Sequence, residues 1–227
     1  MIYLAKKQEI LLDIYNRLLS YFGHRNWWPG ETKWEIIAGA ILTQNVSWKN
    51  VEQAIENLKE AGIFDLEAIY NAPPDQIAEL IRPSRYYNVK AKKLKAVAQH
   101  IMEKYEGDID IILSKPLPQL RKELLDIWGI GPETADSIIL YAAELPSFVV
   151  DAYTKRIYNR LGIFTAEVNY DEMRDYFMQY LPHDKELYND YHAQIVALGH
   201  NICKNKPKCQ NCPLEELKLC IDNGGKS

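Results

Sequence analysis

The amino-acid sequence predicts an all-α protein, because apolar residues recur at helical spacing along most of the chain. Residues 10–22, 51–58 and 94–101 each carry an apolar residue every three or four positions, which builds one apolar face of a helix. Only residues 147–150 have the pattern of an extended segment, which is too short to found a sheet. We therefore expect about ten helices and no sheet.

Turn-forming residues separate the predicted helices. Pro73 and Pro74 open a short helix, and Pro83 ends it. The predicted helices with the clearest boundaries cover residues 2–22, 75–81, 170–180 and 186–203.

Composition and charge exclude a membrane protein and leave a nucleic-acid partner open. The chain has 227 residues, 47% of them hydrophobic, and no apolar run approaches the ~18 residues of a membrane span. The chain has a formal net charge of -4 and a pI near 5.8, whereas nucleic-acid-binding domains commonly have a positive net charge and a high pI. Residues 82–96, however, carry six basic side chains and no acidic one. This run is either a solvated helix face or a surface for an anionic partner.

All the cysteines lie in one C-terminal run, Cys203, Cys209, Cys212 and Cys220. Thiolates are ligands of iron-sulfur clusters and of zinc, and four within 18 residues can reach one centre. Two disulfides would need an oxidising compartment, and no basic-then-apolar signal segment opens the sequence. Structural zinc sites usually pair two C-x2-C motifs, whereas only Cys209 and Cys212 have that spacing. The pattern therefore favours an iron-sulfur cluster.

Residues 117–143 predict two helices joined by a tight hairpin. The first helix runs into Gly129-Ile130-Gly131, and Pro132 suits the start of the second because that position needs no N–H. The two glycines allow the turn and leave backbone N–H groups uncovered. Such groups at a helix N-terminus bind phosphate, so the hairpin predicts contact with a nucleic-acid backbone. An ordinary antiparallel helix pair with a glycine turn is the alternative.

Asp151 follows the hairpin by about twenty residues and stands between an apolar segment and a predicted helix. An aspartate in this place caps the helix N-terminus, and the helix dipole favours its charged form. Asp151 can therefore be a plain cap, a carboxylate aimed at a reaction centre, or both.

The order of these motifs resembles the endonuclease III superfamily of helix-hairpin-helix DNA glycosylases. The resemblance rests on the Gly-Ile-Gly hairpin, on Asp151, on the segment 191–199 and on the cysteine run that follows it. It extends over nearly the whole chain.

The resemblance implies a bilobal all-α fold, with a six-helix barrel that carries the hairpin in residues 32–145. The other lobe would combine residues 1–31 with residues 146–227 and hold a 4Fe-4S cluster on the four cysteines. The partner would be double-stranded DNA with a damaged base, bound across the cleft between the lobes, with no membrane partner. We expect a cytoplasmic monomer, associated with the nucleoid when bound to DNA.

The resemblance also assigns roles to single residues. Asp151 matches the family's catalytic aspartate, which stabilises positive charge on the deoxyribose and orients or deprotonates the attacking water. These enzymes rotate the target base out of the duplex. Gln44 matches the residue that fills the resulting gap, and Tyr86 falls where the family inserts a wedge, although a capping glutamine and a core tyrosine are alternatives. The residues expected to bind the DNA backbone are Gly129, Ile130, Gly131 and Thr134.

The chain departs from bifunctional members of the family at Glu133. Those members have a lysine at this position, and its amine attacks the sugar to form a Schiff base before the strand is cut. A carboxylate cannot form an imine, so the sequence predicts a monofunctional glycosylase. The cysteine spacing C-x5-C-x2-C-x7-C also departs from the commoner C-x6-C-x2-C-x5-C.

The predicted base pocket consists of Trp27, Trp28, Pro29 and Trp48. A Trp-Trp-Pro element and an aromatic residue at this spacing resemble the 3-methyladenine glycosylase branch, in which they sandwich the flipped base. The structural alternative is that these aromatic residues belong to the core. Two other functions remain open, a monofunctional glycosylase for uracil, thymine or adenine in mismatches, and a DNA-binding protein without catalysis.

Overall fold

The computed structural model describes residues 2–25, 30–44 and 46–220 and confirms the all-α prediction. These residues form twelve α-helices and three short 3-10 helices, and none of them lies in a β-strand. The sequence predicts about ten helices, and it does not resolve short helices such as α4 (Leu66–Asn71) and α7 (Ile109–Leu113). In the part of the chain that is described, no helix is both long and apolar enough to cross a membrane.

The helices divide between two compact units, residues 1–27 with residues 146–227, and residues 28–145. The first unit contains α1 (Ile2–Phe22), α10 (Ala152–Arg160), α11 (Tyr170–Tyr180), α12 (Lys185–Asn201), η2 (Cys209–Asn211) and η3 (Glu215–Leu217). The second unit contains α2 (Lys33–Leu42), α3 (Trp48–Glu60), α4, α5 (Pro74–Leu80), η1 (Arg82–Ser84), α6 (Tyr87–Tyr105), α7, α8 (Leu117–Asp126) and α9 (Pro132–Tyr141).

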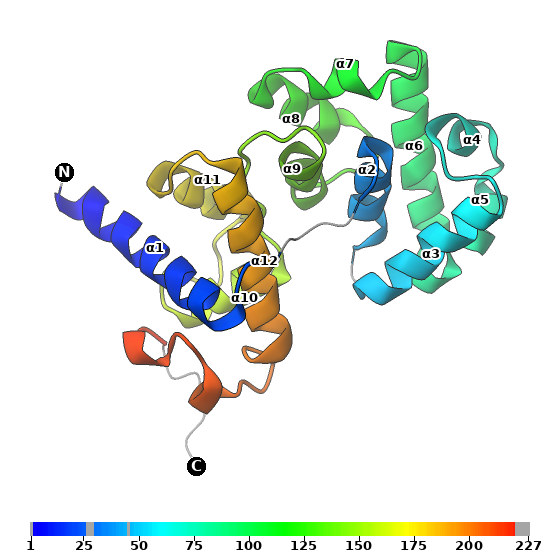
Figure 1. Cartoon of the computed structure of the whole chain (residues 1–227). Coiled ribbons are helices and arrows are strands. Elements are labelled where there is room, and N and C mark those ends of the chain that lie inside the picture. The colour runs from blue at the N-terminus through cyan, green and yellow to red at the C-terminus, as the bar shows by residue number, and fades with distance from the viewer. Residues whose placement is uncertain (1, 26–29, 45, 221–227) are drawn as a thin grey trace. The chain divides into compact units, whose positions relative to one another are not determined.

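Helix α6 is the longest element of the second unit and packs against α2, α4, α5 and α7 (Figure 1). Its apolar face is buried, with Leu94 and Ala98 fully inaccessible to solvent. The unit's core combines side chains from these helices with residues of α8 and α9, such as Leu120 and Ile138. Because so many elements rest on α6, its polar side chains lie close to several loops at once.

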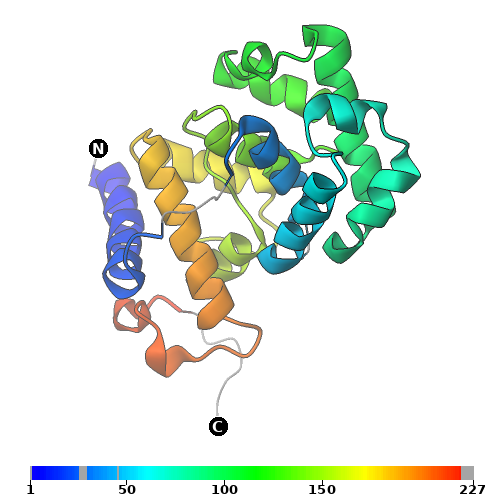
Figure 2. The ribbon, with the colours of Figure 1, turned by 45° about the vertical axis from the view of Figure 1, so that its right-hand side comes forward.

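The first unit is built on α12, which packs against α1 and α10 (Figure 2). Its core is aromatic. Phe148 stacks on Phe177 with ring centroids 4.0 Å apart, and Tyr191 meets Phe148 edge-on. The buried hydroxyl groups of Tyr158 and Tyr191 are satisfied, since they lie 2.5 Å apart and Tyr191 donates to the Leu11 carbonyl at 2.6 Å.

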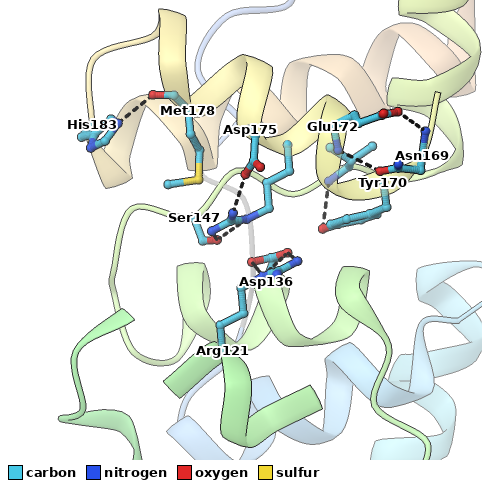
Figure 3. A network of polar contacts seen from close by, with 11 residues as sticks. Arg121, Asp136, Ser147, Asn169, Tyr170, Glu172, Asp175, Met178 and His183 are labelled. Carbon is cyan, nitrogen blue, oxygen red and sulfur yellow. Dashed lines mark hydrogen bonds and ion pairs between the residues drawn. The ribbon is translucent and has the colours of Figure 1, made fainter. Parts of the chain in front are cut away.

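The segment before Asp151 is not helical, as the sequence predicts, and helix α11 holds it (Figure 3). The Arg174 guanidinium is buried and donates to the Ser147 hydroxyl from Nε at 3.1 Å and from a terminal nitrogen at 3.0 Å. Val150 donates its backbone N–H to the Tyr170 hydroxyl at 3.4 Å. These bonds fix the chain on both sides of Phe148 and so fix the entry into α10.

Helices α10 and α12 approach closely at Gly199. A Cβ atom at this position would lie 2.3 Å from Cδ1 and 2.8 Å from Cβ of Tyr153. No side chain fits in that space without displacing Tyr153.

We therefore expect Gly199→Ala to destabilise the protein by about 1–3 kcal/mol, as overpacking does in other cores. The steric cost outweighs the gain of roughly 1 kcal/mol that alanine brings to a helix interior. Urea unfolding of the purified protein measures the difference. Adding Tyr153→Ala should recover part of the loss, and a more stable single variant would show that the two helices are free to separate.

Candidate functional site

Asp151 caps the N-terminus of α10 with a nearly buried side chain. Its Oδ1 accepts hydrogen bonds from the Thr154 backbone N–H at 2.7 Å and from the Thr154 hydroxyl at 2.8 Å. Its Oδ2 lies 3.7 Å from Nε2 of His192, a residue of α12 that is also buried. Three groups from two helices therefore surround one carboxylate.

These neighbours keep the Asp151 carboxylate charged. Burial by itself raises the pKa of this carboxyl, but His192 and the two donors of Thr154 act in the opposite direction and leave it below its usual range. The N-terminus of α10 also favours negative charge at this point. Asp151 is thus an anion at neutral pH in a place that water hardly reaches, which suits a group that stabilises positive charge.

The predicted hairpin forms between α8 and α9. Gly129 has a φ of +84°, the left-handed region that only glycine enters without strain, and Ile130 between the two glycines is buried. Gly131 is the N-cap of α9 and faces open space, since a Cβ atom added there would meet nothing within 4 Å. The first helical bond runs from Ala135 N–H to Gly131 O. The first N–H groups of a helix have no partner within the helix, which is why helix N-termini attract anions.

A buried ion pair locks the two helices of the hairpin together (Figure 3). Arg121 of α8 donates to both oxygens of Asp136 of α9, with Nε 3.0 Å from Oδ1 and a terminal nitrogen 3.1 Å from Oδ2. Asp136 is fully inaccessible to solvent. A two-pronged bond of this kind fixes both distance and orientation, so the hairpin is rigid before any ligand arrives.

Gln44 lies in the loop after α2, and its amide is held at both ends. Its Oε1 accepts from Lys93 Nζ of α6 at 2.6 Å, and its Nε2 donates to the Thr134 hydroxyl of α9 at 2.7 Å. The alkyl chain of Lys93 also rests against Gly129, where a Cβ would lie only 2.6 Å from it. Gln44 is therefore next to the hairpin rather than capping a helix.

Tyr86 is exposed and stands directly before α6. Its side chain is 69% accessible, so the alternative of a core tyrosine is wrong. Both Arg85 and Tyr86 have positive φ angles, 56° and 45°, which cost non-glycine residues roughly 1–3 kcal/mol each. A strained backbone and an exposed aromatic ring at the same position are expected of a residue that contacts a partner.

Trp48 is the first residue of α3 and half-buried against the core of its unit, with its indole N–H donated to Glu52 at 2.9 Å. Trp27, Trp28 and Pro29 lie outside the described residues, so the predicted base pocket stays a prediction. Glu133 is exposed in the first turn of α9.

Helix α10 holds the loop that carries the cysteines. Arg156 donates to the carbonyls of Cys203 at 2.9 Å and Gly199 at 3.0 Å. Arg160, one turn later, donates to Cys203 Sγ at 3.2 Å and to the Lys204 carbonyl at 2.6 Å. The helix that begins at Asp151 thus anchors the first cysteine at its other end.

The four cysteines have the right chemistry for a cluster, although among the described residues no group of three or more His, Cys, Asp or Glu side chains is arranged to hold a metal ion. Burial raises the pKa of the Cys212 thiol to about 11, and the negative charges of Cys220, Cys203 and Cys209 contribute to the rise. All three are therefore within electrostatic range of Cys212. Iron binding would reverse this effect, because a metal stabilises thiolates. The iron-sulfur cluster remains a prediction.

Several residues that support this site carry no sequence signal that predicts their role. Lys90 belongs to the basic run 82–96, yet it is only 2% exposed, and burial lowers its pKa to about 8 with help from Lys93. His192 stands in the segment that carries the family resemblance, but its place beside Asp151 depends on the packing of α12 on α10. The spacing of three between Asp151 and Thr154 is a capping pattern and could have indicated that pair.

Known proteins share the sequence pattern and the fold of this chain. The sequence pattern of the HhH-GPD superfamily of base excision DNA repair proteins matches residues 38–183. A protein of Methanocaldococcus jannaschii, named as a candidate DNA repair glycosylase, is 50% identical over 214 residues, 94% of this chain and 97% of that protein.

Two solved structures share the fold. An endonuclease III bound to DNA superimposes with a TM-score of 0.80 over 95% of each chain at 22% identity. A 3-methyladenine DNA glycosylase of H. pylori, bound to 1,N6-ethenoadenine, has a TM-score of 0.72 and 30% identity over 85% of this chain and 96% of that one.

We predict that His192→Leu raises the pKa of the Asp151 carboxyl, because His192 is the largest of the influences that lower it. A carboxyl whose pKa is depressed in the folded state stabilises the fold above its unfolded pKa, and this contribution is lost as pH falls through the folded pKa. The variant should therefore lose stability at a higher pH than the wild type does. Carboxyl titration by NMR and acid unfolding measure the two effects.

His183→Leu is the control, since His183 is exposed and contacts the Met178 carbonyl instead. An unchanged Asp151 titration in His192→Leu would mean that Thr154 and the helix terminus alone keep the carboxylate charged.

Proposed function

The chain belongs to the HhH-GPD superfamily of base excision DNA repair proteins, and on this basis we propose that it is a monofunctional DNA glycosylase for an alkylated purine such as 3-methyladenine. The observation that carries the proposal is the buried, charged carboxylate of Asp151 at the start of α10. A helix cap that serves folding alone does not need to be nearly dry, since Asp184 at the start of α12 caps while exposed.

Asp151 would act on the sugar of the flipped nucleotide. As the bond between C1′ and the base breaks, the bonding electrons leave with the base and positive charge develops on the deoxyribose. A fixed anion in a site of low dielectric stabilises that charge strongly. Water then attacks C1′ and loses a proton to Asp151 or to solvent, which leaves an abasic site and the free base.

The hairpin and two side chains would hold the DNA. Open space in front of Gly131 and the N–H groups at the start of α9 support contact with a backbone phosphate. Gln44 would fill the gap left by the flipped base, which its position beside the hairpin supports. Tyr86 would enter the stack as a wedge, which its exposure and its strained backbone support.

The absence of strand cleavage follows from Glu133. This residue stands where bifunctional relatives have their nucleophilic lysine, and its carboxylate lacks the amine that an imine requires. Two lysines of α6 are already occupied, since Lys93 is engaged with Gln44 and Lys90 is buried on two carbonyls. Lys155 lies on the first turns of α10 after Asp151 and is exposed, where we expect it to meet phosphate or solvent. We therefore assign hydrolysis rather than β-elimination to this chain.

The substrate assignment rests on aromatic residues and on one relative. Trp27, Trp28, Pro29 and Trp48 would form the pocket, and the face of a tryptophan attracts a cation by roughly 0.5–2 kcal/mol. A purine methylated at N3 carries positive charge, which also weakens its glycosidic bond. The H. pylori 3-methyladenine DNA glycosylase, bound to 1,N6-ethenoadenine, supports the same branch at 30% identity.

We assign a 4Fe-4S cluster to Cys203, Cys209, Cys212 and Cys220. The bound cluster would cross-link the C-terminal loop through four thiolates. The Arg160 guanidinium, 3.2 Å from Cys203 Sγ, suits a sulfur that carries negative charge. Arg156 and Arg160 would hold the first ligand in place with or without iron.

Asp151→Asn keeps the size of the side chain and its ability to cap α10 but removes the charge. We expect release of 3-methyladenine from duplex DNA to fall by at least ~100-fold, the scale of a lost electrostatic or base contribution. Affinity for the same DNA should stay equal or rise, since a negative charge near the backbone is lost. Single-turnover base release and a binding titration give the two numbers.

Asp184→Asn is the matched control, because Asp184 also caps a helix through its side chain but is exposed. It should release the base at the wild-type rate. Near-normal release by Asp151→Asn would remove Asp151 from the mechanism and favour a protein that binds DNA without catalysis.

The cluster assignment predicts a brown protein that contains iron and acid-labile sulfide in comparable amounts. Cys209→Ser should lose both and should unfold the C-terminal loop before it affects base release. Elemental analysis and absorbance spectra of purified protein measure this. Stoichiometric zinc without sulfide would contradict the assignment.

A further inference from the structure

Lys90 connects the loop that carries Gln44 to the turn that carries Tyr86, and we propose that it is a positioning residue through which these two side chains engage DNA together. The inference rests on the DNA contacts proposed above for Gln44 and Tyr86. The new element is that the DNA contact of Gln44 and the DNA contact of Tyr86 depend on each other.

The ammonium group of Lys90 bridges two backbone carbonyls. Its Nζ donates to the Leu42 oxygen at 2.8 Å and to the Ser84 oxygen at 2.5 Å. Leu42 ends α2 and stands two residues before Gln44, and Ser84 ends η1 and stands two residues before Tyr86. One side chain therefore fixes the backbone immediately before Gln44 and immediately before Tyr86.

This connection is strong because it is buried. Lys90 is 2% exposed, and Ser84 is fully inaccessible to solvent. An ammonium in such a place is tolerated only when hydrogen bonds replace its water, and a bond from a charged donor contributes more than a neutral one. Neither carbonyl can turn away without leaving the charge unsatisfied, so the two segments keep a constant separation.

Lys93 extends the connection to the side chain of Gln44. It lies on the same face of α6 as Lys90, donates to the Gln44 oxygen at 2.6 Å and rests against Gly129 of the hairpin. Both the backbone before Gln44 and its terminal amide therefore depend on lysines of α6. We infer that a displacement of the turn at Tyr86 would shift the first turn of α6 and, through Lys90 and Lys93, would also shift Gln44.

A second lysine of α6 serves as a control for the general stabilising effect of a lysine that bridges two carbonyls. Lys95 also bridges two backbone carbonyls, those of Tyr70 and Ala72, with its Nζ 3.0 Å from the Ala72 oxygen. Those carbonyls lie in the last turn of α4 and at its C-cap, and neither segment leads to Gln44 or Tyr86. Both lysines stabilise the unit in the same way, but only Lys90 joins the two proposed contacts.

The test is a double-mutant cycle of Gln44→Ala and Tyr86→Ala in three backgrounds: wild type, Lys90→Met and Lys95→Met. Binding is measured to duplex DNA with a tetrahydrofuran abasic-site analogue, by fluorescence anisotropy at constant salt. Each loss is the factor by which the Kd for this DNA rises. In the wild-type background both single variants should raise the Kd, and the factor for the double variant should be at least about threefold smaller than the product of the two single factors. The cause is that either variant already impairs the other contact.

In the Lys90→Met background the factor for the double variant should equal the product of the two single factors. In the Lys95→Met background the departure from that product should persist. Equal departures in all three backgrounds, or loss of the departure in both lysine variants, would overturn the role of Lys90. If Gln44→Ala and Tyr86→Ala leave wild-type binding unchanged, the DNA contacts of the proposed function fail as well. Should Lys90→Met not fold, Lys90→Gln replaces it, because its shorter side chain cannot span both carbonyls.

Discussion

Asp151 keeps its negative charge in a nearly dry position because the backbone N–H and hydroxyl of Thr154 donate to its carboxylate and the His192 ring lies 3.7 Å away. Helices α11 and α12 of the same unit position the groups around this carboxylate. Helix α11 fixes the segment before Asp151 through Arg174 and Tyr170, and α12 brings His192 close by packing on α10. A carboxylate buried without such partners would take up a proton and lose the charge on which the proposed chemistry depends.

Helix α6 has the corresponding role in the unit of residues 28–145. Its apolar face forms part of the core, while Lys90 and Lys93 reach the loops around Gln44, Tyr86 and Gly129. The elements proposed to touch DNA are therefore fixed to one long helix, and Gln44 is also bonded to Thr134 of the hairpin. A rigid helix is a better support than loops alone, since misplacement by about 1 Å can cost two orders of magnitude in rate.

The sequence predicts the all-α fold, the hairpin and the cap at Asp151 well, because each depends on residues close together along the chain. Helical spacing of apolar residues, glycines at a turn and an aspartate before a helix are local signals. The burial of Lys90 could not be predicted, because its neighbours in the run 82–96 resemble those of any solvated lysine. It becomes buried only because α2 and η1 pack around α6. The pairing of His192 with Asp151 is hidden for the same reason, since 41 residues separate them in the sequence.

Hydrolytic release of an alkylated purine without strand cleavage can be measured by incubating the wild-type protein with duplexes that each carry one modified base. The set includes 3-methyladenine, uracil, mismatched thymine, adenine opposite a mismatched base and an oxidised pyrimidine. Chromatography of free bases and gel analysis of the strands, before and after alkali, separate the two reactions. We expect 3-methyladenine to be released fastest and the DNA strand that carried it to break only after alkali. Preferential release of uracil or thymine, or strand cleavage without alkali, would contradict this expectation.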